Sequence, residues 1–204
     1  LWHGEQIRPR SGCIGRDRGR RGAAGKPVEA HPWTDPTKDV LVSFQKTVTY
    51  DVGVETAMDY FASGDTTKAR YEARGEREVE ILESGRTETG ATIRSRRVSE
   101  VEVPSIAKKV MSPTNTMLQT DTWTGPDSKG GYDGIWKLEV DGAPVKSGGT
   151  MRLEPKGDDE VAYTVTGSVE VKVPMVGKKI GSLLESSAQS VLEKEMEHNR
   201  TTLS

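Results

Sequence analysis

Apolar and polar residues alternate in the segment that begins at Leu41, where valine, phenylalanine and tyrosine are separated by serine, glutamine and threonine. A period of two with β-branched side chains is typical of a strand that buries one face. Turn signals such as Ser84-Gly85 separate further segments of this kind. Because the connections are short, the pattern predicts an antiparallel meander. Its later strands are expected over residues 77–83, 91–101, 116–124, 132–140, 145–154 and 160–173.

The last of these strands is the most regular. Valine and tyrosine residues from Val161 to Val173 share one face, and mostly polar residues share the other, so we expect one solvated face. Gly167 lies in its middle, where a glycine allows a bend or bulge that curls the sheet. Residues 104–111 interrupt the meander earlier in the chain, and we expect a short helical turn or a lid there.

Helical periodicity appears on both sides of the meander. Apolar residues from Val54 to Phe61 follow a helical stripe, with Asp51 as the expected N-cap, and a second short helix capped by Asp65 is expected to end near Ala73. A long helix is predicted over 176–201. Its apolar face is sparse and small, so the helix either lies close to the sheet or leaves room beneath it. The residues of this face are Val176, Ile180, Leu184, Ser187, Ala188 and Val191.

The first forty residues differ from the rest in composition. Between Arg8 and Pro27, 15 of 20 residues are Arg, Gly, Ala or Pro, with no period of 2 or 3.6. Such a segment buries too little apolar surface to offset its chain entropy, so we expect residues 1–40 to be a disordered tail before a domain over 41–204. The interleaved arginines leave an RNA-binding arm open. The alternative is a translation start assigned too far upstream, with the true start near Val40 or Val42.

Charge and cysteine content narrow the class of protein. Residues 1–40 hold 8 Lys/Arg and 5 Asp/Glu, whereas the remainder holds 21 and 26 and carries a net charge of −5. An acidic domain gives no electrostatic reason to expect a nucleic-acid partner. The sole cysteine is Cys13, and no apolar run approaches the ~20 residues that cross a bilayer. We therefore expect no stable membrane insertion and a cytoplasmic location.

Two segments carry a resemblance to a known family. The segment from Tyr163 to Ile180, YTVTGSVEVKVPMVGKKI, resembles the strand-to-helix junction of a bacterial domain of unknown function, family 2505. The segment LQTDTW, from Leu118 to Trp123, resembles the central strand of the same family. The resemblance covers about residues 41–204. It implies the START-like (SRPBCC) helix-grip fold, an α+β architecture in which a curved antiparallel sheet of about seven strands wraps around a long C-terminal helix.

The resemblance also implies a hydrophobic cavity between the sheet and that helix. Inward side chains would line it, either as walls of a binding site or simply as core. The candidates for this lining are Phe44, Met117, Trp136, Met151, Tyr163 and Leu184. The family implies no activity and no cofactor, because the superfamily contains carriers of lipids, sterols, polyketides and hormones as well as cyclising enzymes.

Three polar strand residues are candidates for the cavity as well. Gln119 and Asp121 share one strand face, and Arg97 is a possible ionic partner for an inward Asp121. A buried carboxylate needs such a partner, since unpaired burial is costly. The alternative is that Arg97 and Asp121 lie on the solvated side of the sheet, which is the commoner position for charged strand residues.

No residue of the sequence indicates a catalytic or metal site with any specificity. Glu195 and His198 have the spacing of two metal ligands on a helix, but His198 is the only histidine after residue 40. A second such motif is missing, so we expect a solvated helix end there and no metal. One histidine also leaves no Ser-His-Asp triad in the domain.

Three functions are therefore held against each other. The first is a binder of a hydrophobic or amphipathic, lipid-like small molecule. The second is an enzyme of the polyketide cyclase or dehydratase kind, which needs at least two polar groups converging in the cavity. The third is a protein-interaction module, which needs an exposed apolar patch beyond a few hundred Å². The polar outer face of the last strand disfavours the third.

Overall fold

The computed structural model describes residues 40–100, 108, 112–143, 145–171 and 177–204. The expectations for the tail over residues 1–40 and for the interruption at 104–111, apart from Lys108, lie outside these residues. In chain order the elements are β1 (Val40–Tyr50), α1 (Val54–Ala62), α2 (Gly64–Ala73), β2 (Arg77–Thr87), β3 (Gly90–Glu100), β4 (Thr114–Thr124), β5 (Tyr132–Val140), β6 (Val145–Pro155), β7 (Val161–Val171) and α3 (Gly177–Thr202).

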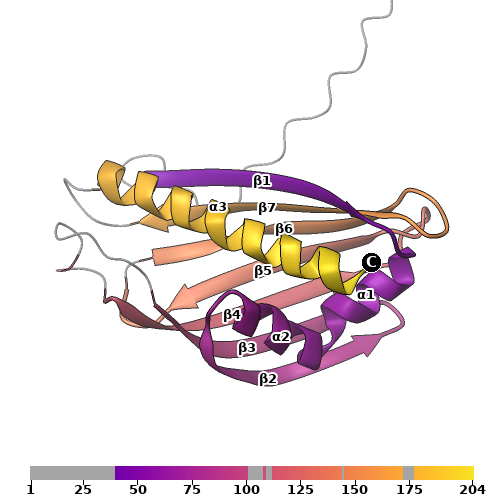
Figure 1. Ribbon diagram of the computed structural model, residues 1–204, viewed down its shortest axis with the longest axis horizontal. Helices are drawn as coiled ribbons and strands as arrows, with labels where there is room; N and C mark the ends of the chain where they lie inside the picture. Colours follow the sequence, from indigo (N-terminus) through magenta and orange to yellow (C-terminus); the bar gives the residue numbers. More distant parts are fainter. Residues whose placement is uncertain (1–39, 101–107, 109–111, 144, 172–176) are drawn as a thin grey trace, which may run out of the picture. The chain divides into compact units, whose positions relative to one another are not determined.

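The strands form one antiparallel sheet in the order β1-β7-β6-β5-β4-β3-β2. Strands that are neighbours in the sheet also follow one another in the chain, except for β1 and β7, which are the first and the last strand. The three helices lie on the same face of the sheet (Figure 1). The long helix α3 contacts β1, β7 and α2, and α2 also contacts β2. This is the helix-grip fold that the element order predicts.

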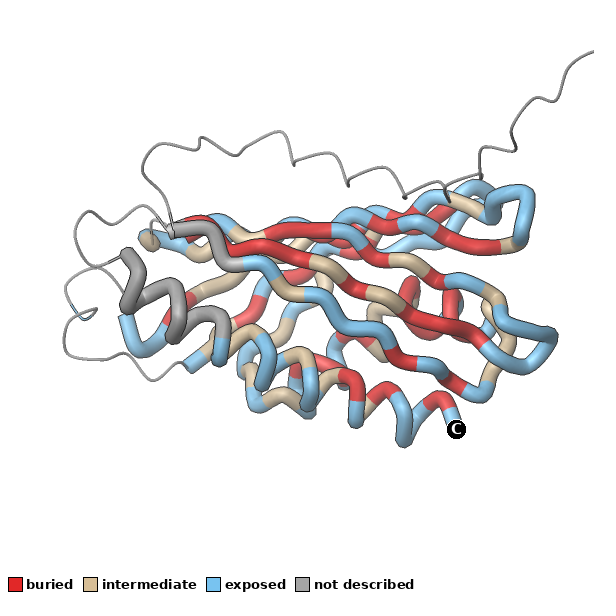
Figure 2. The backbone as a smooth tube through the Cα atoms, turned by 90° about the horizontal axis from the view of Figure 1, so that it is seen from above, coloured by how far each residue is buried: buried red, intermediate tan, exposed pale blue. Residues whose placement is uncertain are grey.

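Buried residues recur along the strands (Figure 2), and in β5 they alternate with exposed ones, as in a sheet covered on one face. The core lies between the sheet and the helices. Phe61 of α1 is at its centre, with its ring stacked on Tyr163 at a centroid distance of 4.5 Å and tilted against Trp123 at 6.0 Å. The apolar stripe of α1 is therefore what fixes this short helix on the sheet.

Three local expectations are wrong. The N-cap of α1 is Gly53 rather than Asp51, and no side chain caps that helix. The N-cap of α2 is Ser63 rather than Asp65, because the Ser63 hydroxyl accepts a hydrogen bond from the Thr66 amide. Strand β2 continues through the supposed turn at Ser84-Gly85, since Ser84 and Gly85 pair in register with Ile93 and Thr92.

Gly167 does not bend the strand by a bulge, because the pairing of β7 with β1 and β6 runs through it without a shift in register. It makes room instead for two rings. A Cβ atom on Gly167 would lie 2.4 Å from the ring of Trp136 and 2.5 Å from the ring of Phe44. These two rings lie 6.1 Å apart, centroid to centroid. The missing side chain thus lets the aromatic residues of β1 and β5 approach the middle of the sheet.

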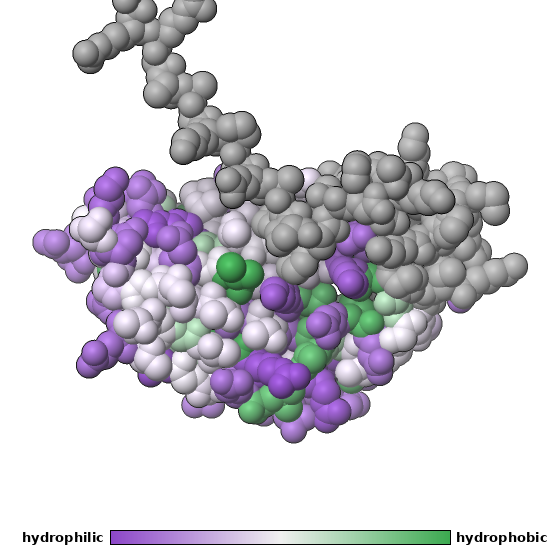
Figure 3. Space-filling model, turned by 180° about the vertical axis from the view of Figure 1, so that it is seen from behind, coloured by the Kyte–Doolittle hydropathy of each residue, from purple (hydrophilic) through white to green (hydrophobic). Residues whose placement is uncertain are grey.

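The outer face of the sheet is mostly polar, with apolar atoms in small groups separated by polar ones (Figure 3). Hydroxyl pairs lie across neighbouring strands there, such as Thr47 with Thr164 at 2.9 Å. In the described part of the chain, the exposed large apolar residues are Leu82, Ile135 and Val191, on three different elements. No helix within the same residues has the length and apolar character that a bilayer crossing needs.

Candidate functional site

A cavity of about 210 Å³ lies between the inner face of the sheet and α3. The residues of α3 that line it include Ser187, Ala188, Val191 and Leu192. The small side chains of Ser187 and Ala188 therefore leave room beneath the helix, which settles for this part of α3 the choice that the sequence leaves open. For scale, a cavity of ~150 Å³ in another protein holds a benzene molecule.

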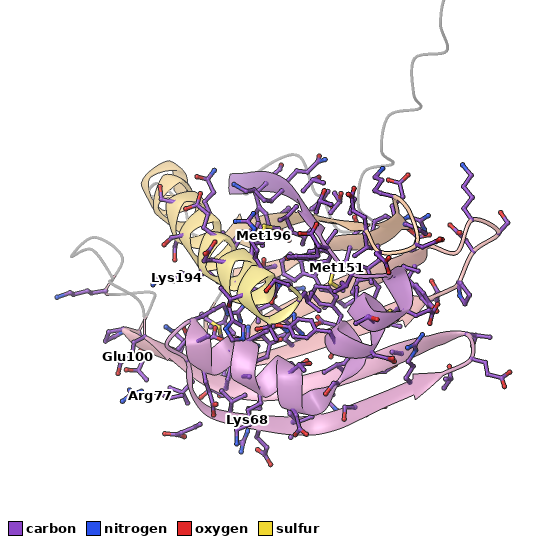
Figure 4. All side chains as sticks on the ribbon, turned by 45° about the vertical axis from the view of Figure 1, so that its right-hand side comes forward. Lys68, Arg77, Glu100, Met151, Lys194 and Met196 are labelled. Atoms are coloured by element: carbon purple, nitrogen blue, oxygen red, sulfur yellow. The ribbon has the colours of Figure 1, made fainter. Side chains whose placement is uncertain are left out.

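Apolar side chains line the cavity on the side of β1, β5, β6 and β7. Five of the six candidates are among the lining residues, namely Phe44, Met117, Trp136, Met151 and Tyr163. In Figure 4, Met151 lies among the side chains between the sheet and the helices, whereas Lys68 and Arg77 point away from that space. The sixth candidate, Leu184, lies in α3 where side chains are outside the described residues. That these residues contact a ligand remains a prediction.

Ionised groups line the opposite side of the cavity, next to α2, β3 and β4. Arg70, Arg74 and Arg97 are almost fully buried there, with side chains 5%, 7% and 3% exposed. Two carboxylates lie among them. Glu195 of α3 accepts hydrogen bonds from Arg70 at 2.9 Å and from Arg74, and Glu76 accepts one from Arg74 at 2.8 Å. We call these five residues the arginine cluster.

Arg97 begins a chain of hydrogen bonds along the sheet. Its Nη2 donates to Gln119 Oε1 at 2.8 Å, and Gln119 Nε2 donates to Asp121 Oδ1 at 2.8 Å. Its Nε lies 2.8 Å from Glu76 Oε2, and its guanidinium carbon lies 4.0 Å from the centre of the Tyr71 ring. The solvated alternative is therefore wrong for Arg97 and Asp121, which are 3% and 6% exposed.

The physical reason is that partners from distant parts of the chain satisfy these charges. Tyr71 lies in α2, Glu76 follows shortly after that helix, and Glu195 comes from α3, so helices and sheet enclose the guanidinium groups together. The sequence did contain one signal. Arg97 lies on the same strand face as Ile93 and Ser95, and Asp121 lies on the same face as Trp123. Each charged residue therefore shares its face with a buried aromatic or aliphatic residue.

The pKa values of two carboxyl groups of the site, those of Asp121 and Glu195, are shifted in opposite directions. Burial raises the pKa of Asp121, and the hydrogen bond from Gln119 and the charge of Arg70 lower it only in part. Burial also acts to raise the pKa of Glu195, but the guanidinium groups of Arg74 and Arg70 outweigh it and hold that pKa below its ordinary range. Glu195 is thus the anion that holds the arginine cluster, whereas burial makes the charged form of Asp121 less favourable than it is in water.

Replacing Asp121 with asparagine is expected to raise the free energy of unfolding at pH 7 by about 0.5–2 kcal/mol. The raised pKa means that, above the ordinary carboxyl range, the folded protein binds a proton more tightly than the unfolded chain does. Stability therefore falls as the pH rises through that window, and the neutral amide removes this loss. Urea denaturation of both proteins at pH 4 and pH 7 measures it, and a gain that is equal at both pH values contradicts it.

Several residues of the site were not predicted from the sequence, above all Arg70, Arg74, Glu76 and Glu195. Glu195 was expected on a solvated helix end and is buried instead. Its neighbour Asn199 is fully buried, where Oδ1 accepts a hydrogen bond from Tyr60 and Nδ2 donates one to Tyr50. The C-terminal part of α3 is thus a structural anchor. Within the described chain, no group of three potential metal ligands lies together.

Several solved structures are similar to this chain at low sequence identity. The protein TTHA0849 from Thermus thermophilus is 16% identical, with a TM-score of 0.52 over 80% of this chain and 100% of the other. A START superfamily protein from Mycobacterium smegmatis is 18% identical, with a TM-score of 0.49 over 79% and 99%. The Zhui aromatase/cyclase from Streptomyces sp. R1128 is 14% identical, with a TM-score of 0.47 over 78% and 93%.

The likeness to TTHA0849 concerns the fold alone, since fold does not determine activity. No curated protein matches the chain. A family match covers residues 45–203, which include every lining residue of the cavity except Phe44. This helix-grip chain therefore belongs to the family described as "Protein of unknown function (DUF2505)".

Proposed function

We propose that this domain binds an amphipathic small molecule in the cavity between the sheet and α3. The observation that carries the proposal is the division of the cavity wall into two sides. Phe44, Trp136 and Val165 contribute apolar surface on one side, and the arginine cluster with Gln119 and Asp121 contributes polar groups on the other. A mostly apolar concavity with a few convergent polar groups is the usual form of a ligand site.

The size of the cavity supports a molecule rather than a few solvent molecules. Its volume of about 210 Å³ exceeds the ~150 Å³ that accommodates benzene in another protein. Well-packed interiors leave few voids larger than a single water molecule. A bound ligand that fills a cavity of this size would contact the lining residues and gain dispersion attraction from them.

A second candidate function is acid catalysis on the bound molecule, as in the cyclase alternative. The specific observation in its favour is that Arg97 and Asp121 both line the cavity, joined through Gln119. A carboxyl group whose pKa is raised keeps its proton to higher pH, which is what a general acid requires. Turnover of a bound compound that Asp121→Asn abolishes without weakening binding would establish it. Unchanged turnover in that variant would dismiss Asp121.

Replacing Ala188 with tryptophan is expected to weaken binding of an apolar probe at least tenfold, because the indole would fill the cavity from the α3 side. The probe is 2-naphthol, and its fluorescence in a titration of the full chain gives the dissociation constant. Gln189→Trp is the matched control, since Gln189 is the adjacent residue of α3 and is exposed.

The two variants separate cavity binding from surface binding. The proposal requires that Gln189→Trp bind the probe with wild-type affinity while Ala188→Trp does not. Equal affinity of all three proteins would show that the probe binds elsewhere and would overturn the proposal. Native mass spectrometry of the purified full chain then identifies a natural ligand as a mass present in the wild type and missing from Ala188→Trp.

A further inference from the structure

Resting on that proposed function, we propose that the cavity selects a monocarboxylate, whose head binds Arg97 Nη1 and whose apolar body lies against Phe44 and Trp136. The inference names the chemical class of the ligand. It starts from a donor group that the folded chain leaves unused at the cavity wall.

Arg97 Nη1 is buried and has no hydrogen-bond partner among the described residues. Of the other two guanidinium nitrogens, Nη2 donates to Gln119, and Nε lies 2.8 Å from Glu76 Oε2 in an ion pair without a hydrogen bond. The side chain is 97% buried and belongs to the cavity wall. A buried charged donor without an acceptor is costly, so an acceptor group on a ligand would bind there favourably.

The guanidinium of Arg97 is also held in one orientation. The Tyr71 ring packs against it at 4.0 Å, the Gln119 amide fixes one edge, and the Glu76 carboxylate fixes another. Gln119 is itself oriented by its hydrogen bond to Asp121. A donor that is ordered before the ligand arrives loses little freedom on binding, which favours affinity and a defined geometry for the head group.

The charges of the polar side favour an anion over a neutral acceptor. Glu195 is shared by Arg70 and Arg74, and Glu76 is shared by Arg74 and Arg97. Two carboxylates thus serve three guanidinium groups. Asp121 contacts the Gln119 amide rather than an arginine nitrogen in the hydrogen-bond chain. These contacts leave Arg97 Nη1 without an acceptor, and a carboxylate is an acceptor that matches a guanidinium in both charge and geometry.

The apolar side sets the rest of the ligand. Phe44, Trp136 and Val165 are aromatic or aliphatic wall residues, and the indole nitrogen of Trp136 is already bonded to the Thr166 carbonyl at 3.0 Å. The body of the ligand therefore needs no polar group where it contacts these residues. A volume of about 210 Å³ suits a body of roughly one or two rings, or a short aliphatic chain.

The test compares acids with their uncharged amides on the full-length protein at pH 7 by isothermal titration calorimetry. The pairs are benzoate with benzamide, 2-naphthoate with 2-naphthamide, and octanoate with octanamide. We expect the acid of at least one pair to bind at least tenfold more tightly than its amide, because its head forms a charge-assisted hydrogen bond. The wild-type comparison needs no variant to fold.

Variants then assign the preference to one side chain. Arg97→Gln should reduce the affinity for the acid to that for the amide, and Arg97→Lys should leave part of the preference because it keeps the charge. Arg96→Gln is the matched control, since Arg96 is the next residue of β3, is exposed and pairs with Glu80. It should keep the full preference.

The outcomes separate this inference from the function on which it rests. If acids and amides bind equally well, the carboxylate inference is overturned while the cavity remains a ligand site. If Arg96→Gln loses the preference as Arg97→Gln does, the head binds outside the cavity and the inference is also overturned. If none of the six compounds binds, nor 2-naphthol, the proposed function itself is refuted.

Discussion

Replacing Glu195 with alanine is expected to lower the free energy of unfolding by about 3–5 kcal/mol at pH 7. The Glu195 side chain is 12% exposed and is the shared acceptor of Arg70 and Arg74, which are themselves almost fully buried. Removing it leaves Arg70 without a carboxylate partner and Arg74 with Glu76 alone, while both guanidinium groups stay almost fully buried. A broken buried ion pair is among the most destabilising changes that one substitution can make.

The matched control is Glu193→Ala, two residues earlier in the same helix. Glu193 is 68% exposed and lies 4.0 Å from Lys46, so its loss should change the unfolding free energy by no more than about 0.5 kcal/mol. Urea denaturation of the wild type and both variants measures the difference. A loss below about 1 kcal/mol in Glu195→Ala would show that water reaches the arginine cluster and would contradict its burial.

The effect of Glu195 also has a defined pH dependence. Its pKa in the folded protein is lowered from the ordinary 4.5 by Arg74 and Arg70, although burial opposes that shift. Its stabilising contribution is therefore fully present above about pH 4.5 and is lost as the pH falls through the folded pKa. The stability gap between the wild type and Glu195→Ala should narrow on acidification below that pH, while the gap to Glu193→Ala stays near zero.

The architecture was predictable because it depends on periodicity that each segment carries locally. The helical stripe of α1 indicates which face is buried, and the structure confirms it. In β7 the apolar face is buried as expected, but the expectation that the other face is solvated was wrong, because Ala162, Ser168 and Glu170 are buried as well. Where two local signals compete, the prediction was wrong. Ser84-Gly85 looks like a turn, but Gly85 has open space around it and pairs across β2 and β3 as an ordinary strand residue.

The polar half of the site was not predictable in the same way. Arg70 and Glu195 are 125 residues apart, and no local pattern links α2 to the end of α3. From the sequence alone, a charged residue is expected at the surface, because burying an unpaired charge is costly and the sequence does not reveal a partner for it. The alternative that Arg97 and Asp121 face solvent was wrong for this reason. Charged residues that share a strand face with aromatic residues should be expected to be buried when helices cover that face.

The apolar floor of the cavity depends on glycines as much as on aromatic rings. In the register of the sheet, Gly167 pairs with Phe44 on one neighbouring strand and with Gly149 on the other. Gly149 in turn pairs with Trp136. Two adjacent strands thus lack side chains where the two rings meet. The sequence showed these glycines, but only the pairing of four strands reveals that they form one row.

Replacing Gly149 with valine is expected to lower the free energy of unfolding by about 3 kcal/mol or more, or to prevent folding. A Cβ atom there would lie 1.9 Å from the Thr166 carbonyl oxygen and 2.6 Å from the Gly167 Cα. Both are backbone atoms of a central strand, so no rotation of a side chain can relieve the overlap. Circular dichroism on heating and urea denaturation measure the loss.

Gly85→Val separates this steric effect from the general effect of replacing a strand glycine. Gly85 is exposed in β2, and no heavy atom lies within 4 Å of its Cβ position. Valine has the higher β-propensity and restricts the unfolded chain, so this variant should be as stable as the wild type or slightly more stable. Comparable losses in the two variants would refute close backbone contact at Gly149. A large loss in Gly149→Val alone would establish that the floor of the cavity requires a residue without a side chain.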